Sequence, residues 1–295
     1  MPDPSTSEGR TATLRKTAVA AFRHVPVPVL ARLVDLPLPA PLDRAVAKGL
    51  GGREVVIRRG PAAGLRYDAA EADPFGALGT YETPVQEALV AHLQPGDVFY
   101  DIGANVGFFS VLGARLVAPG GWVYAFEPAP DNAELVRRNL AANRFHHTEV
   151  LEVAVAGEPA TTELELSGYA GGHALVSAGG TPDHAGVVTV EAVVIDDLVA
   201  AGRLRPPTLV KIDVEGAELD VLHGMARTID EHRPHLLVEV DHEHRAGLTE
   251  RRAGIEAFLG EAGYEWTELE PAYPGIAWEV AHLMASPTDR SSPTA

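Results

Sequence analysis

VFYDIGANVG, residues 98–107, is the stretch that decides the fold of this chain. It begins as an apolar run typical of a buried strand, reaches an acid at Asp101 and turns through two glycines into the apolar segment 108–116. A strand, a tight loop and a helix in this order form the first half of a βαβ unit. Gly103 and Gly107 permit a sharp turn and leave room for a ligand, because neither carries a Cβ atom. The helix N-terminus would direct unpaired N–H groups at that ligand, as in nucleotide sites.

The spacing of the glycines indicates which nucleotide fits. A dinucleotide fingerprint requires G-x-G-x-x-G, but Asn105 and Phe108 stand at the second and third of these positions. No phosphate-binding G-x-x-x-x-G-K-[ST] loop occurs in the sequence. An acid, a glycine, an asparagine and a second glycine suit a ligand with an amino-acid end and a nucleoside end. S-adenosylmethionine (SAM) is such a ligand.

The next predicted strand, 121–126, ends in Glu127, twenty residues after Gly107. In Rossmann-type folds an acid at this point binds both ribose hydroxyls through a bidentate hydrogen bond. The alternative is that Glu127 only caps the helix that follows Pro128. We expect the ribose contact because the acid follows the Asp101 loop.

Composition bounds the class of protein. With 46% hydrophobic and 22% charged residues, the 295-residue chain can bury a substantial core in one large or two small domains. The net charge of −17 argues against nucleic-acid binding, which depends on clustered Lys and Arg side chains. The absence of cysteine excludes disulfides and thiolate metal ligands. No run of about eighteen apolar residues occurs, so we expect no membrane span and a cytoplasmic protein.

The N-terminal part is expected to be an appendage to the main domain. Its first dozen residues are rich in Pro, Ser and Thr, which is typical of a disordered tail. Residues 13–25 alternate basic and apolar side chains at helical spacing and lack the apolar core of a signal peptide. Such a helix could lie on a membrane surface, but we expect it to pack on its own domain or on a second subunit, which allows a homodimer. A small hairpin is predicted over 54–58 and 65–68. The predicted division is a disordered tail (1–12), a helical and hairpin appendage (13–75) and a main domain (76–295).

Strand and helix patterns alternate through the main domain, which predicts an α/β fold with a mostly parallel sheet and helices on both faces. The last two strands are separated only by the short segment 270–276, so we expect an antiparallel edge hairpin there. Asp131 is the predicted N-cap of the helix that follows the second strand. After the first strand, the predicted strands cover 122–126, 149–155, 209–214, 235–240, 264–269 and 277–284. The predicted helices cover 84–92, 108–116, 131–143 and 249–262.

Two segments depart from plain alternation. Residues 167–186 contain six glycines and two histidines, and a glycine-rich stretch of this length inside a compact domain is usually functional or disordered. It could cover the carboxyl ends of the strands, where open α/β sheets bind ligands, and is our candidate lid. The second segment is KIDVEGAE, residues 211–218, in which an apolar strand delivers four charged residues to one strand end. We expect these charges to serve the site, with a structural ion-pair network as the alternative.

Together these motifs resemble the FkbM family of SAM-dependent methyltransferases, a class I Rossmann-like group. The resemblance extends over residues 81–239. It implies a seven-stranded, mostly parallel sheet with a reversed last strand, and methyl transfer to a hydroxyl of a natural product or sugar, as in secondary metabolism. The motifs that carry it are DIGANVGFFS (101–110), AFEPAPDN (125–132), the helix end 139–143, Ala154-Val155 and KIDVEGAE (211–218).

The resemblance also implies roles for individual residues. Glu127 is expected to hold the ribose, and Asp213 to face the reacting centre. The loop around the methionine end of SAM is expected to consist of Asp101, Gly103, Asn105 and Gly107. Further cofactor contacts are expected from Glu82, Pro128, Asn132 and Ala154. Glu152 stands where the family often has Asn, which leaves the adenine contact open.

Methyl transfer to an alcohol requires an oxygen in line with the methyl group, and either a base or a metal to remove its proton. Asp213 ends the fourth predicted strand, and Glu239 and Asp241 end the fifth, so these acids could converge on Mg²⁺ as in metal-dependent O-methyltransferases. The alternative is a solvated turn at 241–244. In that case His242 or His173 is the candidate base.

Several functions stay open beside the leading one, a SAM-dependent methyltransferase with a small hydroxylated acceptor. One is a SAM-binding protein without catalytic activity. Another is methyl transfer to a nitrogen or a carboxylate acceptor. An oxidoreductase on the same fold is disfavoured, because Asn105 and Phe108 break the dinucleotide fingerprint.

Overall fold

A computed structural model of the chain describes residues 52–69, 75–167, 173–178, 184–273 and 278–288, together with isolated positions between 25 and 50. The predicted tail at 1–12 and most of the predicted helix at 13–25 lie outside these residues. The chain divides into two units, residues 1–81 and 82–295.

The described part of the first unit contains the predicted hairpin. Strand β1 (Val55–Val56) pairs antiparallel with β2 (Arg66–Tyr67). A backbone hydrogen bond from the Ile57 N–H to the Leu65 carbonyl extends the pairing toward the turn. A short helix, α4 (Phe75–Leu78), follows.

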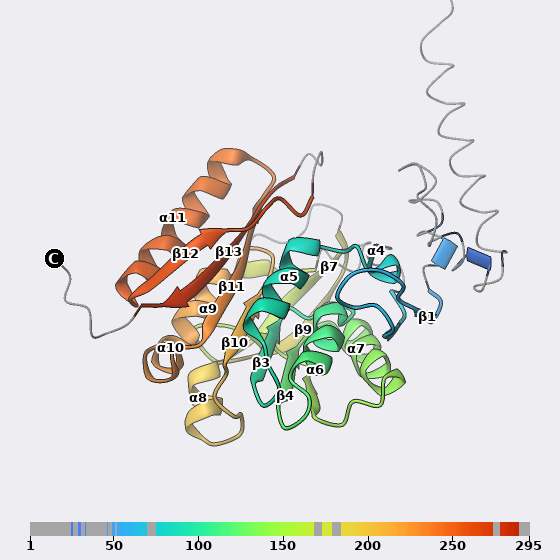
Figure 1. Cartoon of the computed structure of the whole chain (residues 1–295). Coiled ribbons are helices and arrows are strands. Elements are labelled where there is room, and N and C mark those ends of the chain that lie inside the picture. Colours follow the sequence, from blue (N-terminus) through green and yellow to red (C-terminus); the bar gives the residue numbers. More distant parts are fainter. Residues whose placement is uncertain are drawn as a thin grey trace, which may run out of the picture. The chain divides into compact units, whose positions relative to one another are not determined.

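A seven-stranded sheet forms the centre of the second unit (Figure 1). Strand β13 runs antiparallel to both of its neighbours, whereas the other six strands are parallel to one another. The predicted mostly parallel sheet with a reversed last strand is therefore confirmed. In spatial order the strands are β12 (Tyr264–Glu268), β13 (Glu279–Pro287), β11 (His235–His242), β10 (Leu209–Ile212), β3 (Val98–Ile102), β4 (Trp122–Phe126) and β5 (Thr148–Leu151).

The closing hairpin differs from its prediction in one respect. β12 and β13 are antiparallel as expected, but β13 lies between β11 and β12, so only β12 is at the edge. The side chains of Ala281, Leu283 and Ala285 are buried in β13. A buried apolar strand is stabilised by hydrogen-bonded strands on both sides. The half-exposed side chains of β12 suit a strand at the edge of the sheet.

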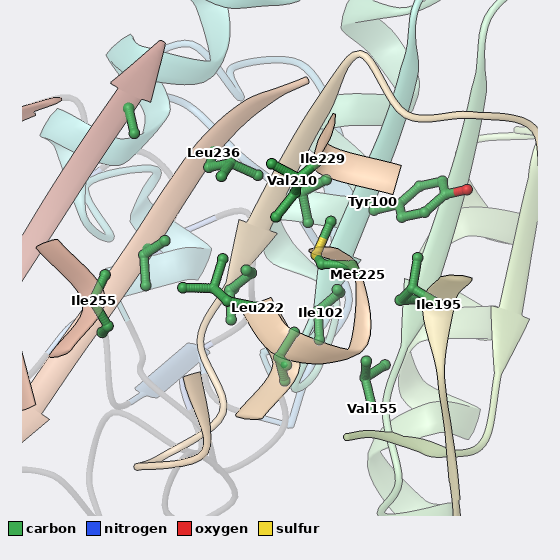
Figure 2. Close-up of a cluster of buried hydrophobic side chains, with 14 of the residues drawn as sticks. Tyr100, Ile102, Val155, Ile195, Val210, Leu222, Met225, Ile229, Leu236 and Ile255 are labelled. Carbon is green, nitrogen blue, oxygen red and sulfur yellow. The ribbon is translucent and has the colours of Figure 1, made fainter. Parts of the chain in front are cut away.

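One face of the sheet is apolar and packs against four helices. Side chains of a strand alternate between the two faces, and Tyr100, Ile102, Val210 and Leu236 point to the same side (Figure 2). Figure 2 shows them packed against Ile195, Leu222, Met225, Ile229 and Ile255. Met225 lies between α9 (Glu218–Gly224) and α10 (Ala226–His232). The other partners come from these two helices, from α8 (Ile195–Ala200) and from α11 (Arg245–Glu261).

The other helices lie on the opposite face of the sheet (Figure 1). They are α5 (Thr83–His92), α6 (Phe108–Leu116) and α7 (Pro130–Ala142). A Cβ atom on Gly113 of α6 would lie 2.4 Å from the Phe99 ring, which shows how closely α6 packs on β3. The predicted helix 108–116 is confirmed, because α6 begins and ends at these residues. The N-cap prediction for Asp131 is wrong, because α7 begins one residue earlier at Pro130, a favoured first helical residue, with Ala129 as N-cap.

A second sheet was missed by the sequence analysis. The predicted strand 149–155 is split: β5 ends at Leu151, and Ala154 and Val155 form β6 in this second sheet. Its strand order is β6, β9 (His184–Val193), β7 (Ala160–Ser167) and β8 (Ala174–Leu175). The buried side chains of Leu164, Leu175 and Val190 pack with Ala129 and Ala154, so this sheet adjoins the main sheet just after Glu127. The candidate lid, 167–186, connects its strands, and residues 168–172 and 179–183 of that segment are outside the described residues.

Candidate active site

The loop after β3 depends on its glycines. Gly103 and Gly107 have φ angles of 81° and 86°, in the region that favours glycine. A Cβ atom on Gly103 would lie 1.7 Å from the carbonyl oxygen of Asp213. Asn105, between the two glycines, also has a positive φ, of 52°. The absence of a side chain at Gly103 therefore lets the loop touch the chain just beyond β10.

Asp101 offers an unused acceptor beside this loop. Its carboxylate is 1% exposed, and Oδ2 accepts a hydrogen bond from the Ser110 hydroxyl at 2.5 Å. Oδ1 is buried and has no hydrogen-bond partner among the described residues. Burial raises the pKa of Asp101, and the charge of Lys211 opposes that rise. A buried carboxylate oxygen without a partner fits the ammonium group of an amino-acid ligand.

Glu127 ties the loop to the start of α7. Its Oε2 accepts the Asn105 N–H at 2.7 Å and its Oε1 accepts the Ala129 N–H at 2.9 Å. The cap interpretation is thus part of its role, since Ala129 is the N-cap of α7. Each carboxylate oxygen can accept a second hydrogen bond, so a diol ligand remains compatible with this geometry. Burial raises the pKa of Glu127 to about 8.

Of the remaining predicted cofactor residues, Asn132 and Pro128 lie near this loop and Ala154 lies in the second sheet, whereas Glu82 belongs to a separate group with Glu239 and His282. Asn132 donates to the side-chain oxygen of Asn105 at 3.3 Å. Pro128 is half-buried next to Glu127, and Ala154 is buried in the core of the second sheet together with Ala129. Asn139, which was not predicted, donates to the Val106 carbonyl at 2.8 Å and holds the loop from α7.

A row of ionisable side chains crosses the sheet at its carboxyl edge. Ile212 and Val238 are paired in the parallel strands β10 and β11, so the next residues, Asp213 and Glu239, lie side by side. Glu239 is in turn paired with His282 of β13. These residues alternate with the apolar ones of Figure 2 and therefore belong to the opposite face of the sheet, which α5 and α6 cover (Figure 1).

Lys211 lies one row earlier, paired with Asp101 of β3. Its side chain is 2% exposed, forms an ion pair with Asp213 at 2.7 Å and lies over the Phe109 ring of α6. Burial would lower the pKa of Lys211, but the charges of Asp213 and Asp101 outweigh it and raise the pKa. Burial raises the pKa of Asp213, against the effect of Lys211. Lys211 therefore holds the Asp213 carboxylate in place with a permanent positive charge.

Glu82, Glu239 and His282 form a second group beside this pair. His282 Nε2 lies 2.6 Å from Glu239 Oε2 and 3.4 Å from Glu82 Oε2. The Tyr273 hydroxyl donates to the other oxygen of Glu82. Burial opposes charge on His282, but the two carboxylates raise its pKa to about 10. Burial and the nearby Asp213 raise the pKa of Glu239 to about 8.

The structure places the predicted bases in other surroundings. His242 is three residues after Glu239 in β11, so the two side chains point to opposite faces of the sheet. The His242 ring lies against Gly247 in the first turns of α11, and a Cβ atom added to Gly247 would be 2.3 Å from that ring. His173 accepts the Ser167 N–H at 3.0 Å next to β8. Alternation along the strand therefore puts His242 on the face opposite to Asp213, a position that does not support its predicted role as the base.

The predicted Mg²⁺ ligands each have other partners. Asp213 pairs with Lys211, and Glu239 contacts His282. Asp241 accepts the Trp278 indole N–H at 2.5 Å and lies 3.5 Å from the Arg251 guanidinium. Sequence reasoning did not single out His282 or Tyr273. The available signal was a histidine inside the apolar run Ala281–Ala285, because a buried polar side chain requires a partner.

Residues 101–266, more than half of the chain, match the family model described as the methyltransferase FkbM domain. The chain belongs to the FkbM methyltransferase family. The predicted resemblance is thereby confirmed, and the strand order of the sheet agrees with the class I fold that it implied. Within the described ranges, none of the helices of this FkbM protein combines the length and the apolar character needed to cross a membrane.

Two curated relatives illustrate the similarity. The chain is 30% identical over 151 residues to the hexuronic acid methyltransferase AglP of Haloferax volcanii, covering 50% of this chain and 58% of that protein. It is 31% identical over 160 residues to the 31-O-demethyl-FK506 methyltransferase FkbM of Streptomyces tacrolimicus, covering 45% and 61%. The chain thus spans about three fifths of the length of these relatives. A crystal structure of methyltransferase FkbM from Methylobacillus flagellatus KT is 18% identical, with a TM-score of 0.45 over 72% of this chain and 55% of that chain.

Proposed function

We propose that the protein transfers a methyl group from SAM to a hydroxyl of a small natural product or sugar. The observation that carries this proposal is the contact between the glycine loop and the end of β10. Gly103 lies against the backbone carbonyl of Asp213, so the loop expected to hold the methionine end of SAM adjoins a residue that carries a carboxylate. A cofactor loop and a carboxylate at neighbouring strand ends provide the two parts that an O-methyltransferase needs.

The residues around the loop fit SAM as a ligand. Asp101 Oδ1 is a buried acceptor for the ammonium group, and Glu127 can accept hydrogen bonds from the ribose hydroxyls. SAM supplies a methyl group already activated by the sulfonium centre. The task of the chain is to align the acceptor oxygen and remove its proton.

We assign that task to Asp213. Its side chain is 20% exposed, whereas that of its partner Lys211 is 2% exposed, so the carboxylate faces the open side of the pair. The acceptor oxygen forms its bond to the methyl carbon as the carbon–sulfur bond breaks, and the electron pair of that bond stays on sulfur. The hydroxyl proton passes to Asp213, whose position Lys211 maintains.

The acceptor class is supported by the names of the relatives. One name specifies a hexuronic acid and the other an O-demethylated form of FK506. Both descriptions fit hydroxylated small molecules, although a hexuronic acid also offers a carboxylate. We propose the second sheet, with the candidate lid at 167–186, as the cover of the acceptor, since its core adjoins the residues after Glu127.

Two measurements test this function. Calorimetry with SAM, with S-adenosylhomocysteine and with NAD should show binding of the first two only. Incubation with methyl-labelled SAM and a panel of sugars, uronic acids and hydroxylated natural products should yield a methyl ether, located by NMR. A methyl ester product would show that the acceptor group is a carboxylate, and a methylamine product would show that it is a nitrogen. SAM binding with no turnover on any acceptor class would favour a SAM-binding protein without catalytic activity. Binding of NAD in place of SAM would overturn the proposal.

A further inference from the structure

The group formed by Glu82, Glu239 and His282 has the composition of a metal site. Their donor atoms, two carboxylate oxygens and one imidazole nitrogen, all lie within 4.8 Å of one another. Glu239 and His282 are neighbours in the register of β11 and β13, so the sheet itself fixes their separation. Glu82 comes from a different element, the N-cap of α5, where its backbone has a left-handed conformation with φ 39°. A non-glycine residue in this conformation costs about 1–3 kcal/mol and persists where the surroundings hold it.

Glu82 points an unused oxygen into this group. Its side chain is buried, and the Tyr273 hydroxyl donates to Oε1 and thereby orients the carboxylate. Oε2 has no hydrogen-bond partner among the described residues, and it lies 3.4 Å from His282 Nε2. Apart from this long contact with His282, the buried oxygen has no partner among the described residues, and a bound cation would satisfy it more closely.

The charges around the group also favour a cation. Lys211 interacts electrostatically with four carboxylates, namely Glu82, Asp101, Asp213 and Glu239. Two of these four acids, Glu82 and Glu239, belong to the group itself, and carboxylates are common ligands of divalent cations.

The geometry is compatible with a first-row transition ion. Ligands about 2.1 Å from such an ion and at tetrahedral or octahedral angles are about 3.0–3.4 Å apart. The separation of Glu82 Oε2 and His282 Nε2 already has this value, whereas Glu239 would move by a few tenths of an ångström from its 2.6 Å hydrogen bond. The imidazole ligand favours ions such as Mn²⁺ or Zn²⁺ over Mg²⁺ and Ca²⁺, which prefer all-oxygen sites. We therefore propose that Glu82, Glu239 and His282 bind one divalent transition-metal ion, with Tyr273 orienting Glu82 as an outer partner.

Binding is measured on the full-length protein after treatment with EDTA. Titration with Mn²⁺, followed by the EPR signal of the free ion, should show one ion bound per chain, and Zn²⁺ should displace it. Pulsed EPR of the bound Mn²⁺ should show coupling to one imidazole nitrogen, a result that needs no variant. No binding of either ion, or bound Mn²⁺ without nitrogen coupling, would overturn the proposal. SAM calorimetry on the same samples keeps this outcome separate from the proposed function, on which the inference does not rest.

Matched variants locate the site. Glu82→Gln and His282→Gln should each weaken Mn²⁺ by more than the roughly 10- to 100-fold that loss of an outer partner causes. Glu87→Gln, on the exposed side of the same helix, should bind Mn²⁺ like the wild type. His232→Gln is the second control, because His232 also lies near a carboxylate, that of Glu231 at 3.9 Å. If circular dichroism shows that His282→Gln is unfolded, the site is tested by the Mn²⁺ affinity of Glu82→Gln and by the nitrogen coupling of the wild type. Wild-type affinity in a folded Glu82→Gln protein would overturn the assignment.

Discussion

At the scale of single residues, Gly103 combines a left-handed backbone with a collision that any side chain would cause. Gly96 provides a matched control, because its φ of 99° is also positive but its Cβ atom would meet no atom within 4 Å. Both Gly→Ala variants should lose about 1–3 kcal/mol from backbone strain. We expect Gly103→Ala to lose more, since its Cβ atom would lie 1.7 Å from the Asp213 oxygen, and to lose SAM binding as well. Urea denaturation and calorimetry measure the two effects, and equal losses in the two variants would contradict the contact.

The role of Glu127 can be separated from a simple cap by its effect on cofactor affinity. Glu127→Ala removes the acceptor of the Asn105 N–H and the proposed partner of the ribose. We expect SAM binding to weaken by about 2–3 kcal/mol, the contribution of a charge-assisted hydrogen-bond pair. Glu134→Ala, an exposed acid of α7, serves as the control. A loss below about 0.5 kcal/mol would mean that Glu127 only supports the start of the helix.

Asp213 should matter for turnover more than for cofactor binding. Asp213→Asn keeps the shape of the side chain and removes the charge that orients the acceptor and takes its proton. We expect kcat to fall by roughly 10²–10⁴-fold with a much smaller change in SAM affinity. Asp220→Asn, an exposed acid that accepts the Gly157 N–H, is the control. Turnover of Asp213→Asn at the wild-type rate would remove Asp213 from the mechanism.

At the scale of elements, the β7–β9 ladder and the segment that connects it should behave differently in hydrogen exchange. From Ala160 to Glu165, β7 pairs with β9 in an antiparallel ladder without a register shift, and these amides should be protected in the free protein. The lid proposal predicts that exchange within 167–186 becomes slower when SAM and an acceptor are bound together. Strong protection of that whole segment in the free protein would exclude a lid.

At the scale of the whole molecule, buried carboxyls make stability depend on pH. Burial raises the pKa of Glu127 to about 8 and of Glu218 to about 7. Each group binds its proton more tightly in the folded than in the unfolded chain. The contribution of each raised pKa to the stability of the folded protein is therefore complete below about pH 4.5, and it is lost as the pH rises toward 7–8. We expect the free energy of unfolding to fall between pH 5 and about 8, by urea denaturation of the ligand-free protein.

A conservative variant checks the origin of this pH dependence. Glu218→Gln keeps an oxygen that can accept the Gly216 N–H but cannot ionise. Its stability should vary less with pH between 5 and about 8 than that of the wild type, because one raised carboxyl no longer titrates. Glu134→Gln, on the surface, should leave the slope unchanged. An identical slope in Glu218→Gln would show that other groups cause the dependence.

Local pattern was sufficient to predict much of the main sheet. Apolar runs such as Val98–Ile102 and glycine spacing such as Gly103 to Gly107 are properties of neighbouring residues, so periodicity and turn chemistry reveal them. The second sheet was missed because its strands depend on pairing across the candidate lid. Leu164 and Val188 pair between β7 and β9 although a glycine-rich segment separates them in the chain. The position of β13 between β11 and β12 was likewise not predictable, because the local pattern of each strand does not specify which strand it pairs with.

The sequence by itself determined the family, the strand–loop–helix unit around Asp101 and the acids at the strand ends, because short motifs specify these features. Only the tertiary structure decided which of those acids meet which partners. Lys211 pairs with Asp213, two residues later at the end of β10. Glu82 meets His282 across 200 residues, because Glu82 is the N-cap of α5 and the register of β13 places His282 beside Glu239. Alternation along β11 separated His242 from Glu239 and put them on opposite faces. Side chains far apart in sequence become neighbours through strand order and register, which no single segment contains.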